Sequence, residues 1–490
     1  MRKHVVVIGG SVSGLGAGIA LSQDGHRVTI LERDATPMPP TAIEAFEGWD
    51  RRGSPQTRHS HAFLARLHNL LRDRAPDLFE SLLHNGAEQL RFEDMVRKNY
   101  HDPELVPEDD DITLLAIRRI TFEWVLRRHV LDGGLVDFRD GVEVTGLAAE
   151  PGDPPRVTGV QLARRDGSSE RLDADLVLDA SGRRSKLDHW LRAIGAGELE
   201  QESEPCGIFY SSRFYRLRDG AEAPLLGGVM GGDLGYMKFG IFPGDHGIFS
   251  ITLCASPDDP PLRSLLKTPA FEKATAALPA LREWVDPEIS QPISDVHGMG
   301  NLKNTRRFFV REGKPMALGV YPVGDALIHT NPLNGRGCTL AWVNVFAAAE
   351  ELTQHANDPR EFALALDARV ERELVPWYAS TRSQDRDAIE VIQAQQRGED
   401  PYALERPDGT NDPKAYMRSL LREGLLPAMG EDLVLLRSFM RVFNLLEAPQ
   451  DLMKDPTIFQ RVLAAWNRRG EREPVVHGPK RDEMVEQLAL

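Results

Sequence analysis

The first thirty residues alternate between apolar runs and a glycine-rich turn, in the order that predicts a strand, a helix and a second strand. A β-branched run occupies residues 4–8, an apolar stretch with helical spacing covers 15–21, and a second apolar run over 27–31 ends at Glu32. Short continuous apolar runs favour buried strands, whereas apolar residues three and four apart favour a helix. Strands joined through a helix lie parallel in one sheet. This unit predicts an α/β fold that begins with a Rossmann-like domain.

The pattern along the rest of the chain predicts three parts. Two segments have little periodicity: residues 35–60, which we expect to form a long loop, and the last ~20 residues, which we expect to fray. Strand-like runs and helices alternate elsewhere up to residue 355, and helical spacing dominates after it. The predicted parts are a discontinuous Rossmann-like domain over 1–204 and 290–355, an inserted β-rich domain over 205–289 that also takes part of 80–115, and a C-terminal helical region over 356–490.

The composition argues against several functions. Lys and Arg number 59 and Asp and Glu number 74, which gives a net charge of −15. Nucleic acid binding needs a basic surface, so no nucleic acid partner is expected. No stretch approaches the ~20 apolar residues of a transmembrane helix. Cys206, Cys254 and Cys338 are far apart and predict no disulfide framework, so we expect a cytoplasmic protein.

The turn after the first strand has the residues of a dinucleotide-binding loop. Its sequence is Gly9-Gly10-Ser11-Val12-Ser13-Gly14, which keeps two glycines of the G-x-G-x-x-G pattern and has Ser11 in place of the middle one. The free N–H groups of the following helix can bind a pyrophosphate. Glu32 is placed to accept hydrogen bonds from a ribose, and its charge favours FAD or NAD over NADP. The alternative is an ordinary glycine turn and a surface glutamate.

Two later motifs favour FAD. Residues 176–185 predict a strand that ends in Asp179 and continues through Gly182 into a basic turn. The segments Gly324-Asp325 and Pro332-x-x-Gly335-x-Gly337 lead into a helix. A carboxylate at a strand end can bind a ribitol or ribose hydroxyl. A helix N-terminus can stabilise the anionic edge of a reduced flavin.

Together these motifs resemble those of the FAD-dependent monooxygenases of the para-hydroxybenzoate hydroxylase fold. The resemblance covers residues 1–355, and the helical remainder matches no family that we can name. Closer still, the sequence is similar to the bacterial flavin-dependent epoxidases of polyether biosynthesis and their relatives. The shared segments are Pro55-Gln56-x-Arg58-His59-x-His61, Arg119 with Trp124, Asp179-x-x-Gly182-Arg183 and Asn331-Pro332-x-x-Gly335-x-Gly337. Two positions depart from the family pattern: Ser11, and Ile328 where the family often has histidine.

The resemblance implies which residues hold the cofactor. Arg119 would lie near the FAD phosphates or ribose, Asp325 would bind the pyrophosphate–ribitol region, and residues 332–337 would lie against the isoalloxazine. Asp179 and Gly182 would touch FAD or NAD(P)H, or would only shape their turn. The full predicted set is Gly9, Ser11, Val12, Ser13, Gly14, Glu32, Arg33, Arg58, Arg119, Asp179, Gly182, Gly324, Asp325, Pro332, Gly335, Gly337 and Cys338. Cys338 stands at a helix start, where a thiolate would be stabilised, although a packing role is the alternative.

The loop with two histidines is the most distinctive polar cluster outside these motifs. The resemblance implies that Arg58 contacts the cofactor and that His59 or His61 orients the flavin or exchanges a proton with it. We therefore take His59, His61, Pro332 and Gly337 as the candidate catalytic residues. A metal site is not expected, because no carboxylate or cysteine stands at a helpful spacing. The alternative is a loop that precedes a helix, with Ser60 as its N-cap.

The substrate side is expected in the β-rich domain. Residues 236–243 (YMKFGIFP) predict a strand whose aromatic residues Tyr236, Phe239 and Phe242 face the substrate, or else belong to the core. The apolar residues there and in the C-terminal helices predict a largely apolar small molecule as substrate.

The resemblance also implies the reaction. NAD(P)H would reduce FAD as a transient electron donor, and the distal oxygen of a flavin C4a-hydroperoxide would pass to the substrate by hydroxylation or epoxidation. Three alternatives stay open: a C=C reductase of the prenyl-reductase type, a halogenase-like flavoenzyme, and a binding module without catalysis. Flavin-dependent halogenases carry a Trp-x-Trp-x-Ile-Pro motif, which this chain lacks. A separate flavin reductase is a further alternative for the electron source.

Overall fold

A five-stranded parallel sheet forms the core of the computed structural model, which describes residues 2–134, 136–164, 167–224, 231–405, 409–410, 412–472 and 477–489. The strand order is β20-β9-β1-β2-β5. The strands are β1 (His4–Ile8), β2 (Arg27–Leu31), β5 (Asp137–Arg139), β9 (Leu176–Asp179) and β20 (Val320–Pro322). The first two pair in parallel from His4 opposite Arg27 to Ile8 opposite Leu31. The predicted Rossmann-like α/β core is confirmed.

Two long helices pack together beside this sheet. Helix α1 (Val12–Gln23) contacts α10 (Gly337–Gln354), and α6 (Arg119–Asp132) lies next to α1. Most residues of α1 are buried, which agrees with a helix that is apolar on all sides. A Cβ at Gly16 would lie 3.0 Å from the Trp342 ring, so the absence of a side chain brings the helices close. The antiparallel sheet of β6 (Val142–Glu150), β7 (Arg156–Arg164) and β8 (Ser169–Asp173) contacts β2 and β9.

A second sheet forms the β-rich part. Its path is β12 (Gly231–Asp233), β13 (Met237–Pro243), β14 (Ile248–Ala255), β11 (Phe209–Leu217) and β15 (Ser290–Pro292), and β16 (His297–Met299) also pairs with β11. Because β15 and β16 belong here, this sheet extends beyond the expected boundary at residue 289. Helices α8 (Thr268–Ala277), α9 (Pro279–Arg282) and α17 (Arg481–Leu488) share a core with one of its faces.

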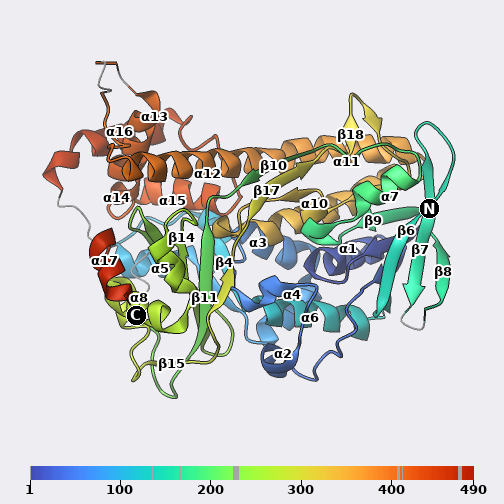
Figure 1. Ribbon diagram of the computed structural model, residues 1–490, viewed down its shortest axis with the longest axis horizontal. Coiled ribbons are helices and arrows are strands. Elements are labelled where there is room, and N and C mark those ends of the chain that lie inside the picture. Colours follow the sequence, from blue (N-terminus) through green and yellow to red (C-terminus); the bar gives the residue numbers. More distant parts are fainter. Residues whose placement is uncertain are drawn as a thin grey trace.

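A narrow sheet joins the two parts. Strands β10 (Gln201–Pro205) and β17 (Lys303–Arg307) run between them, and β21 (Ile328–His329) completes the sheet (Figure 1). The elements before β9 that complete the N-terminal part are α3 (Ala65–Arg74), α4 (Pro76–His84), β3 (Glu88–Arg91), α5 (Phe92–Asn99) and β4 (Thr113–Ala116), and α7 (Leu187–Ala193) follows β9.

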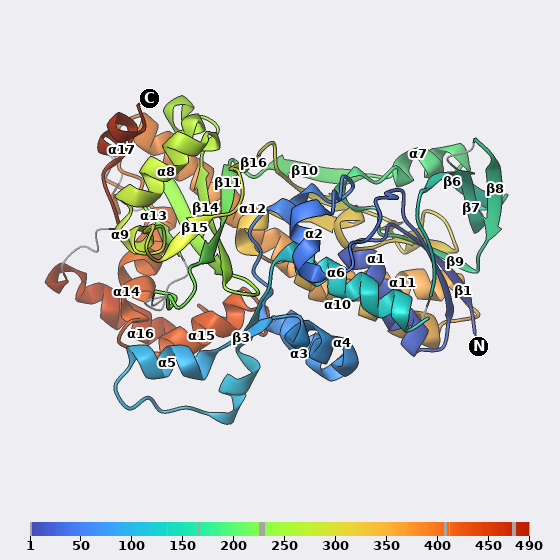
Figure 2. The same cartoon turned by 90° about the horizontal axis from the view of Figure 1, so that it is seen from below.

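The C-terminal region is helical, as predicted. It contains α11 (Pro359–Glu373), α12 (Val375–Gln396), α13 (Pro413–Ser419), α14 (Leu426–Ala428), α15 (Leu433–Phe443) and α16 (Pro456–Asn467). Asp-Pro pairs begin α11, α13 and α16: each aspartate accepts hydrogen bonds from first-turn N–H groups, and each proline occupies the first helical position. Figures 1 and 2 show these helices, coloured orange to red, running along the parallel-sheet core and packing beside the β11–β14 sheet.

Two expectations about unpatterned segments were wrong. The predicted loop over 35–60 contains α2 (Ala42–Gly48), which Thr41 caps by accepting a hydrogen bond from Glu44 N. The predicted frayed end contains α17, whose Met484 and Leu488 are buried in the core beneath the second sheet. Both helices are short, and tertiary packing stabilises such helices more than local pattern does. Within the described residues, none of the helices combines the length and the apolar character that crossing a membrane needs.

The contact between α1 and α10 predicts a large stability effect. Trp342 is fully buried in this contact. We expect Trp342→Ala to destabilise the protein by about 3–5 kcal/mol in urea unfolding, because it leaves a large cavity. Leu131→Ala is the control, since Leu131 is 43% exposed, and it should change stability by less than about 0.5 kcal/mol. Equal effects of the two substitutions would contradict this packing.

Candidate active site

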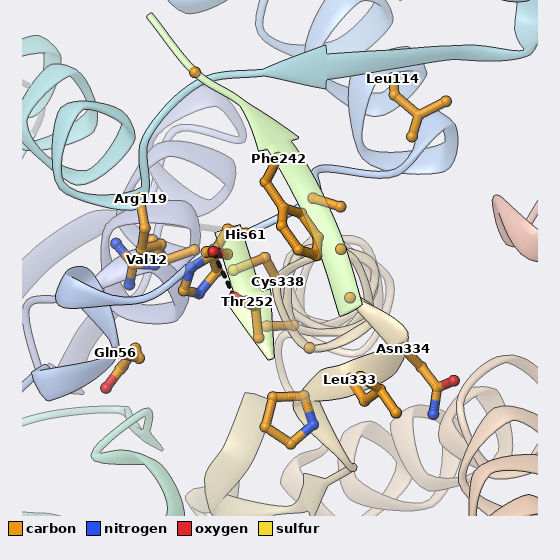
Figure 3. Close-up of a pocket in the computed structure, with 18 of the residues that line it drawn as sticks. Val12, Gln56, His61, Leu114, Arg119, Phe242, Thr252, Leu333, Asn334 and Cys338 are labelled. Atoms are coloured by element: carbon orange, nitrogen blue, oxygen red, sulfur yellow. Dashed lines mark hydrogen bonds between the residues drawn. The ribbon is translucent and has the colours of Figure 1, made fainter. Parts of the chain in front are cut away.

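One continuous cavity connects the predicted cofactor motifs with the β-rich sheet. Its volume is about 1250 Å³, and it runs from the Gly9–Ser13 turn past residues 332–338 to the face of β13 and β14. Ordinary small-molecule sites occupy roughly 300–1000 Å³. The space is therefore large enough for a dinucleotide and a second molecule side by side. Figure 3 shows its central part, with His61, Arg119, Cys338, Thr252 and Phe242 around it.

The glycine turn forms one end of this cavity. Gly9 has φ +107°, and a Cβ there would lie 2.6 Å from the Ala180 carbonyl oxygen. A Cβ at Gly14 would lie 1.8 Å from the Gly9 carbonyl oxygen, so only glycine allows the helix to start this close to the turn. Helix α1 has no side-chain cap. Its first-turn N–H groups, which no intrahelical carbonyl can satisfy, therefore remain available to an anion.

Ser11 does not cap the helix because its hydroxyl belongs to a buried polar network. It donates to Glu123 Oε2 (2.7 Å) and accepts from Arg119 Nη2 and from the Ser54 hydroxyl, each at 3.0 Å. Glu123 also accepts from Arg51 Nε (2.8 Å) and from Arg119 Nη1 (2.7 Å). The departure from the middle glycine thus has a physical explanation: the serine links the turn to this network.

Glu123 is a fully buried carboxylate that stays charged. Burial alone would raise its pKa, but the guanidinium groups of Arg51 and Arg119 outweigh burial and lower the pKa to about 2. Arg51 also pairs with Glu32 (3.2 Å) and Asp34 (2.9 Å), so three carboxylates surround it next to the helix N-terminus. Arg119 lines the cavity, so its guanidinium lies where the pyrophosphate was expected.

Glu32 has room for one further hydrogen bond. Its carboxylate accepts from Gly10 N (3.0 Å), Asp34 N (2.7 Å) and Arg51 Nη2 (3.2 Å). A carboxylate offers about four acceptor sites, so three protein donors leave one for a ligand hydroxyl. Glu32 and the exposed Arg33 both line the cavity.

The Asp179 motif separates into two roles. Asp179 is fully buried and does not line the cavity; its carboxylate accepts from Ser181 N (3.0 Å) and from the Ser185 hydroxyl. Burial raises its pKa. Gly182, with φ +80°, does line the cavity, and a Cβ there would meet nothing within 4 Å. The aspartate shapes the turn, whereas the glycine leaves space beside the cavity.

The third motif places a second helix N-terminus on the same cavity. Helix α10 has no side-chain cap, and a Cβ at its first residue, Gly337, would meet nothing within 4 Å. Gly324 lies behind the cavity, where a Cβ would come within 2.6 Å of the Ser13 hydroxyl oxygen. This close approach brings the following Asp325 to the cavity wall. Burial raises the pKa of Cys338, which favours the neutral thiol and a packing role.

The two histidines occupy different environments. His59 is buried away from the cavity, with Nδ1 3.4 Å from the Ser212 hydroxyl; burial, followed by His297, lowers its pKa to about 4. His61 lines the cavity, and burial, followed by Arg119, lowers its pKa to about 3. The His61 Nδ1 lies 3.0 Å from the His59 carbonyl oxygen, which can only accept. His61 is therefore neutral at neutral pH and carries its proton on Nδ1, which leaves Nε2 as an acceptor.

A row of hydroxyl groups lines the sheet wall beside the histidines. Thr252 Oγ1 donates to Ser60 Oγ (2.7 Å), Ser60 donates to Ser250 Oγ (2.7 Å), and Ser212 Oγ lies 2.8 Å from Thr252 Oγ1. The alternative interpretation of Ser60 as an N-cap was wrong, because α3 begins at Ala65 and Leu64 precedes it. The alternation in Phe249-Ser-Ile-Thr-Leu-Cys254 is the sequence signal for this polar face.

The expected substrate residues lie in different environments in and just before β13. Phe242 lines the cavity, while Phe239 lies at its border and packs in the core beneath the sheet. Tyr236 does not line the cavity, because its hydroxyl donates to the Pro479 carbonyl oxygen (2.8 Å). Apolar side chains from α5, β4 and the C-terminal helices line the far end of the cavity: Phe92, Met95, Leu114, Leu436, Phe439, Met440 and Phe443. Charged residues of β3 and α5 line the cavity beside them: Glu88, Arg91, Asp94 and Lys98.

The structure thus brings most predicted residues to one cavity. Those that line it are Gly9, Ser11, Val12, Ser13, Glu32, Arg33, His61, Arg119, Gly182, Phe239, Phe242, Asp325, Pro332, Gly335, Gly337 and Cys338. Those that do not are Gly14, Arg58, His59, Asp179, Tyr236 and Gly324. The Arg58 side chain is 57% exposed and lies 4.0 Å from Asp50, so it does not reach the cavity. Among the described residues, no cluster of three His, Cys, Asp or Glu side chains could hold a metal ion.

Sequence reasoning missed Arg51 and Glu123. The pair Arg119 and Glu123 had a signal, since residues four apart on a helix face each other and can form an ion pair. Arg51 had none, because it lies in a segment without periodicity and meets Glu123 only through the fold.

Comparisons with known proteins support the fold. No family model matches the chain. Protein Rv3254 of Mycobacterium tuberculosis is 28% identical over 361 residues, which cover 69% of this chain and 70% of that protein. The solved structure of the flavin-dependent brominase Bmp2 aligns with a TM-score of 0.56 at 16% identity and covers 96% of this chain and all of that chain.

Two structures of monooxygenase type align with similar TM-scores and sequence identities. The anhydrotetracycline hydroxylase OxyS of Streptomyces rimosus has a TM-score of 0.56 at 18% identity, covering 91% of this chain and 77% of that chain. PqsL of Pseudomonas aeruginosa, a probable FAD-dependent monooxygenase, has a TM-score of 0.54 at 15% identity. The alignment covers 80% of this chain and 96% of that chain. The chain has the fold of FAD-dependent monooxygenases and halogenases. In this chain, most of the predicted motif residues surround one cavity.

The buried network predicts a large effect of neutralising Glu123. We expect Glu123→Gln to destabilise the protein by about 3–5 kcal/mol in urea unfolding, because the buried Arg119 loses its carboxylate partner and Arg51 keeps only Glu32 and Asp34. The control is Glu93→Gln, which breaks the exposed pair of Glu93 with Arg97, also four residues apart. The control should change stability by less than about 0.5 kcal/mol.

The difference in stability between the wild type and Glu123→Gln should depend on pH. The folded pKa of Glu123 is about 2, below its ordinary value of 4.5. Its contribution is therefore complete above pH 4.5 and is lost as the pH falls toward 2. The wild type should lose its stability advantage over Glu123→Gln across this window in urea unfolding. A constant difference across the window would contradict the depressed pKa.

Proposed function

We propose that this chain is an FAD-dependent monooxygenase that transfers one oxygen atom from O2 to a largely apolar small molecule. One observation carries the proposal: two uncapped helix N-termini, of α1 and α10, open onto one cavity that continues into an apolar space. The motifs around these helix starts are those of the resembling family. The fold comparisons support the proposal without extending it to a substrate.

The residues present fit FAD. The N–H groups at the start of α1, with Arg119 beside them, would hold the pyrophosphate, and the free acceptor site of Glu32 would hold a ribose hydroxyl. Asp325 lines the middle of the cavity, where it would hold a ribitol hydroxyl. The open space at Gly337 would admit the edge of the ring.

The protein's own groups have definite tasks in this chemistry. FAD, when bound and reduced, supplies electrons to O2 so that one oxygen atom can be transferred. The N-terminus of α10 would stabilise negative charge at the ring edge. The neutral His61 can accept a hydrogen bond at Nε2. The hydroxyl row of Ser60 and Thr252 can donate or accept a proton at the cavity wall, while the apolar side chains that α5 and α15 turn to the cavity exclude water.

The apolar end of the cavity supports an alkene or aromatic substrate. Its aromatic and Met side chains can bury the apolar part of a substrate. Charged residues of β3 and α5 also line the cavity and could meet a polar group of that substrate: Glu88, Arg91, Asp94 and Lys98. The similarity of the motifs to polyether epoxidases supports epoxidation, and hydroxylation uses the same oxygen donor. NAD(P)H as the electron source rests on the same resemblance, with a separate flavin reductase as the alternative.

The proposal predicts how the FAD-loaded protein behaves with NAD(P)H. Anaerobic addition should bleach the flavin band near ~450 nm, and O2 should then restore it. Without substrate the balance is NAD(P)H + H⁺ + O2 → NAD(P)⁺ + H2O2; with substrate, one oxygen atom enters the product and the other leaves as water. The ¹⁸O content of the product from ¹⁸O2 measures this transfer.

Other outcomes are informative. Bleaching by dithionite but not by NAD(P)H would indicate a separate reductase. A reduced protein that O2 does not reoxidise would favour the C=C reductase. A protein that binds no flavin would contradict the proposal and leave a binding module.

The ring end can be tested by filling the space at Gly337. We expect Gly337→Val to fold normally, since a Cβ there meets nothing, and to weaken FAD binding at least about tenfold, or about 1.4 kcal/mol, measured by flavin fluorescence titration. The control is Gly48→Val, at a glycine that also has open space around it but does not line the cavity. Unchanged FAD affinity in Gly337→Val would place the ring elsewhere.

Halogenation is the second candidate function. One observation favours it: the fold match to a brominase extends over 96% of this chain, which includes the C-terminal helices. Halogenation would require a halide together with NAD(P)H and O2. Bromide-dependent appearance of a brominated product, instead of an ¹⁸O-labelled one, would favour this candidate.

A further inference from the structure

The C-terminal helix α12 holds the segment that lines the ring end of the cavity. Trp377, Thr381 and Asp385 stand four residues apart on α12, so they share one face of the helix. All three are buried. The face they form meets the two ends of the segment 331–336, whose middle residues, Pro332 to Gly335, line the cavity.

Asp385 fixes the first end. Its Oδ1 accepts from Asn331 Nδ2 (2.8 Å), and its Oδ2 accepts from Asn304 Nδ2 (2.7 Å). Asn304 in turn accepts at Oδ1 from Asn331 N (2.7 Å), and Asn331 Oδ1 accepts from Leu333 N (3.0 Å). Asn304 and Asn331 are almost fully buried. Each donor named here has a fixed acceptor, so these hydrogen bonds hold the backbone at Asn331 in one place.

Thr381 and Trp377 fix the second end. Arg336 Nη1 donates to Thr381 Oγ1 (2.7 Å), and its guanidinium lies 5.1 Å from the centre of the Trp377 ring. Arg336 is buried and directly precedes α10. Burial lowers its pKa to about 10, so it still carries a charge at neutral pH. The start of α10 is therefore held from α12.

We propose that Asp385, with Thr381 and Trp377, positions the segment 331–336 against the bound cofactor, so that a helix outside the recognised motifs is part of the cofactor site. This inference rests on the proposed FAD binding. Asp385 acts as a positioning residue through Asn331 and does not itself line the cavity.

The test compares Asp385→Asn with Asp387→Asn on the same helix. An amide offers one acceptor and one donor where two acceptors are needed, so Asp385→Asn sets two NH2 groups against each other. Asp387 instead pairs with Arg418 (2.6 Å), and its side chain is 41% exposed. We expect Asp385→Asn to weaken FAD binding at least tenfold in fluorescence titration and to shift the flavin reduction potential at saturating FAD. We expect Asp387→Asn to change FAD affinity by less than twofold.

A compensating exchange sharpens the test. In the double variant Asp385→Asn with Asn304→Asp, the introduced amide can donate to the introduced carboxylate and accept from Asn331 Nδ2, while that carboxylate accepts from Asn331 N. All the hydrogen bonds return and the net charge is unchanged. This double variant should recover FAD affinity to within threefold of the wild type.

Several outcomes decide the matter. If Asp385→Asn lowers the melting temperature but leaves FAD affinity and reduction potential unchanged, Asp385 is only structural and the inference is wrong. If Asp385→Asn does not fold, Thr381→Val, which removes the acceptor of Arg336 alone, must show the same FAD effects. If the wild type binds no FAD, the proposed function fails, which is a separate result from failure of this inference.

Discussion

The close packing of α1 on α10 is the constraint on which the cavity depends. Each helix begins at a glycine motif, and each has an uncapped N-terminus that faces the same space. Three glycines make this possible by close approach: Gly14 at the Gly9 carbonyl, Gly16 at the Trp342 ring and Gly324 at the Ser13 hydroxyl. Two positive helix ends within one cavity suit a ligand with negative charge at two separate places. A dinucleotide with a flavin ring is such a ligand.

Charge burial beside α1 gives the cofactor end a second constraint. Taking charges out of water is costly, and the buried side chains of Arg51, Arg119 and Glu123 offset this cost by pairing with one another. Ser11 joins this network to the glycine turn. Of the two positions that depart from the pattern of the resembling family, Ser11 therefore connects the turn to a buried charge network.

The sequence predicts most strongly what depends on local pattern. The unit β1–α1–β2 follows from short apolar runs around a glycine turn, and the three motifs lie at the starts of helices or the ends of strands. The helices α2 and α17 were missed because neither has a long apolar stripe, and packing stabilises both. Arg58 and His59 were expected at the cavity from their neighbours in sequence. The short 3-10 turn over 55–58 instead directs Arg58 outward, and His59 packs against Ser212 and Tyr210 on the face of the second sheet that carries the hydroxyl row. Asp385 pairs with Asn331, 54 residues away, and no periodicity could reveal that contact.

The central claim is that the cavity holds FAD across both helix N-termini, and a crystal structure of the protein with FAD tests it most directly. The account predicts the pyrophosphate at the N-terminus of α1 beside Arg119, a ribose hydroxyl on Glu32, and the isoalloxazine against residues 332–337. The apolar space between β13 and α15 should stay free for a second molecule. FAD bound elsewhere, or a cavity that excludes it at saturating concentration, would contradict the account.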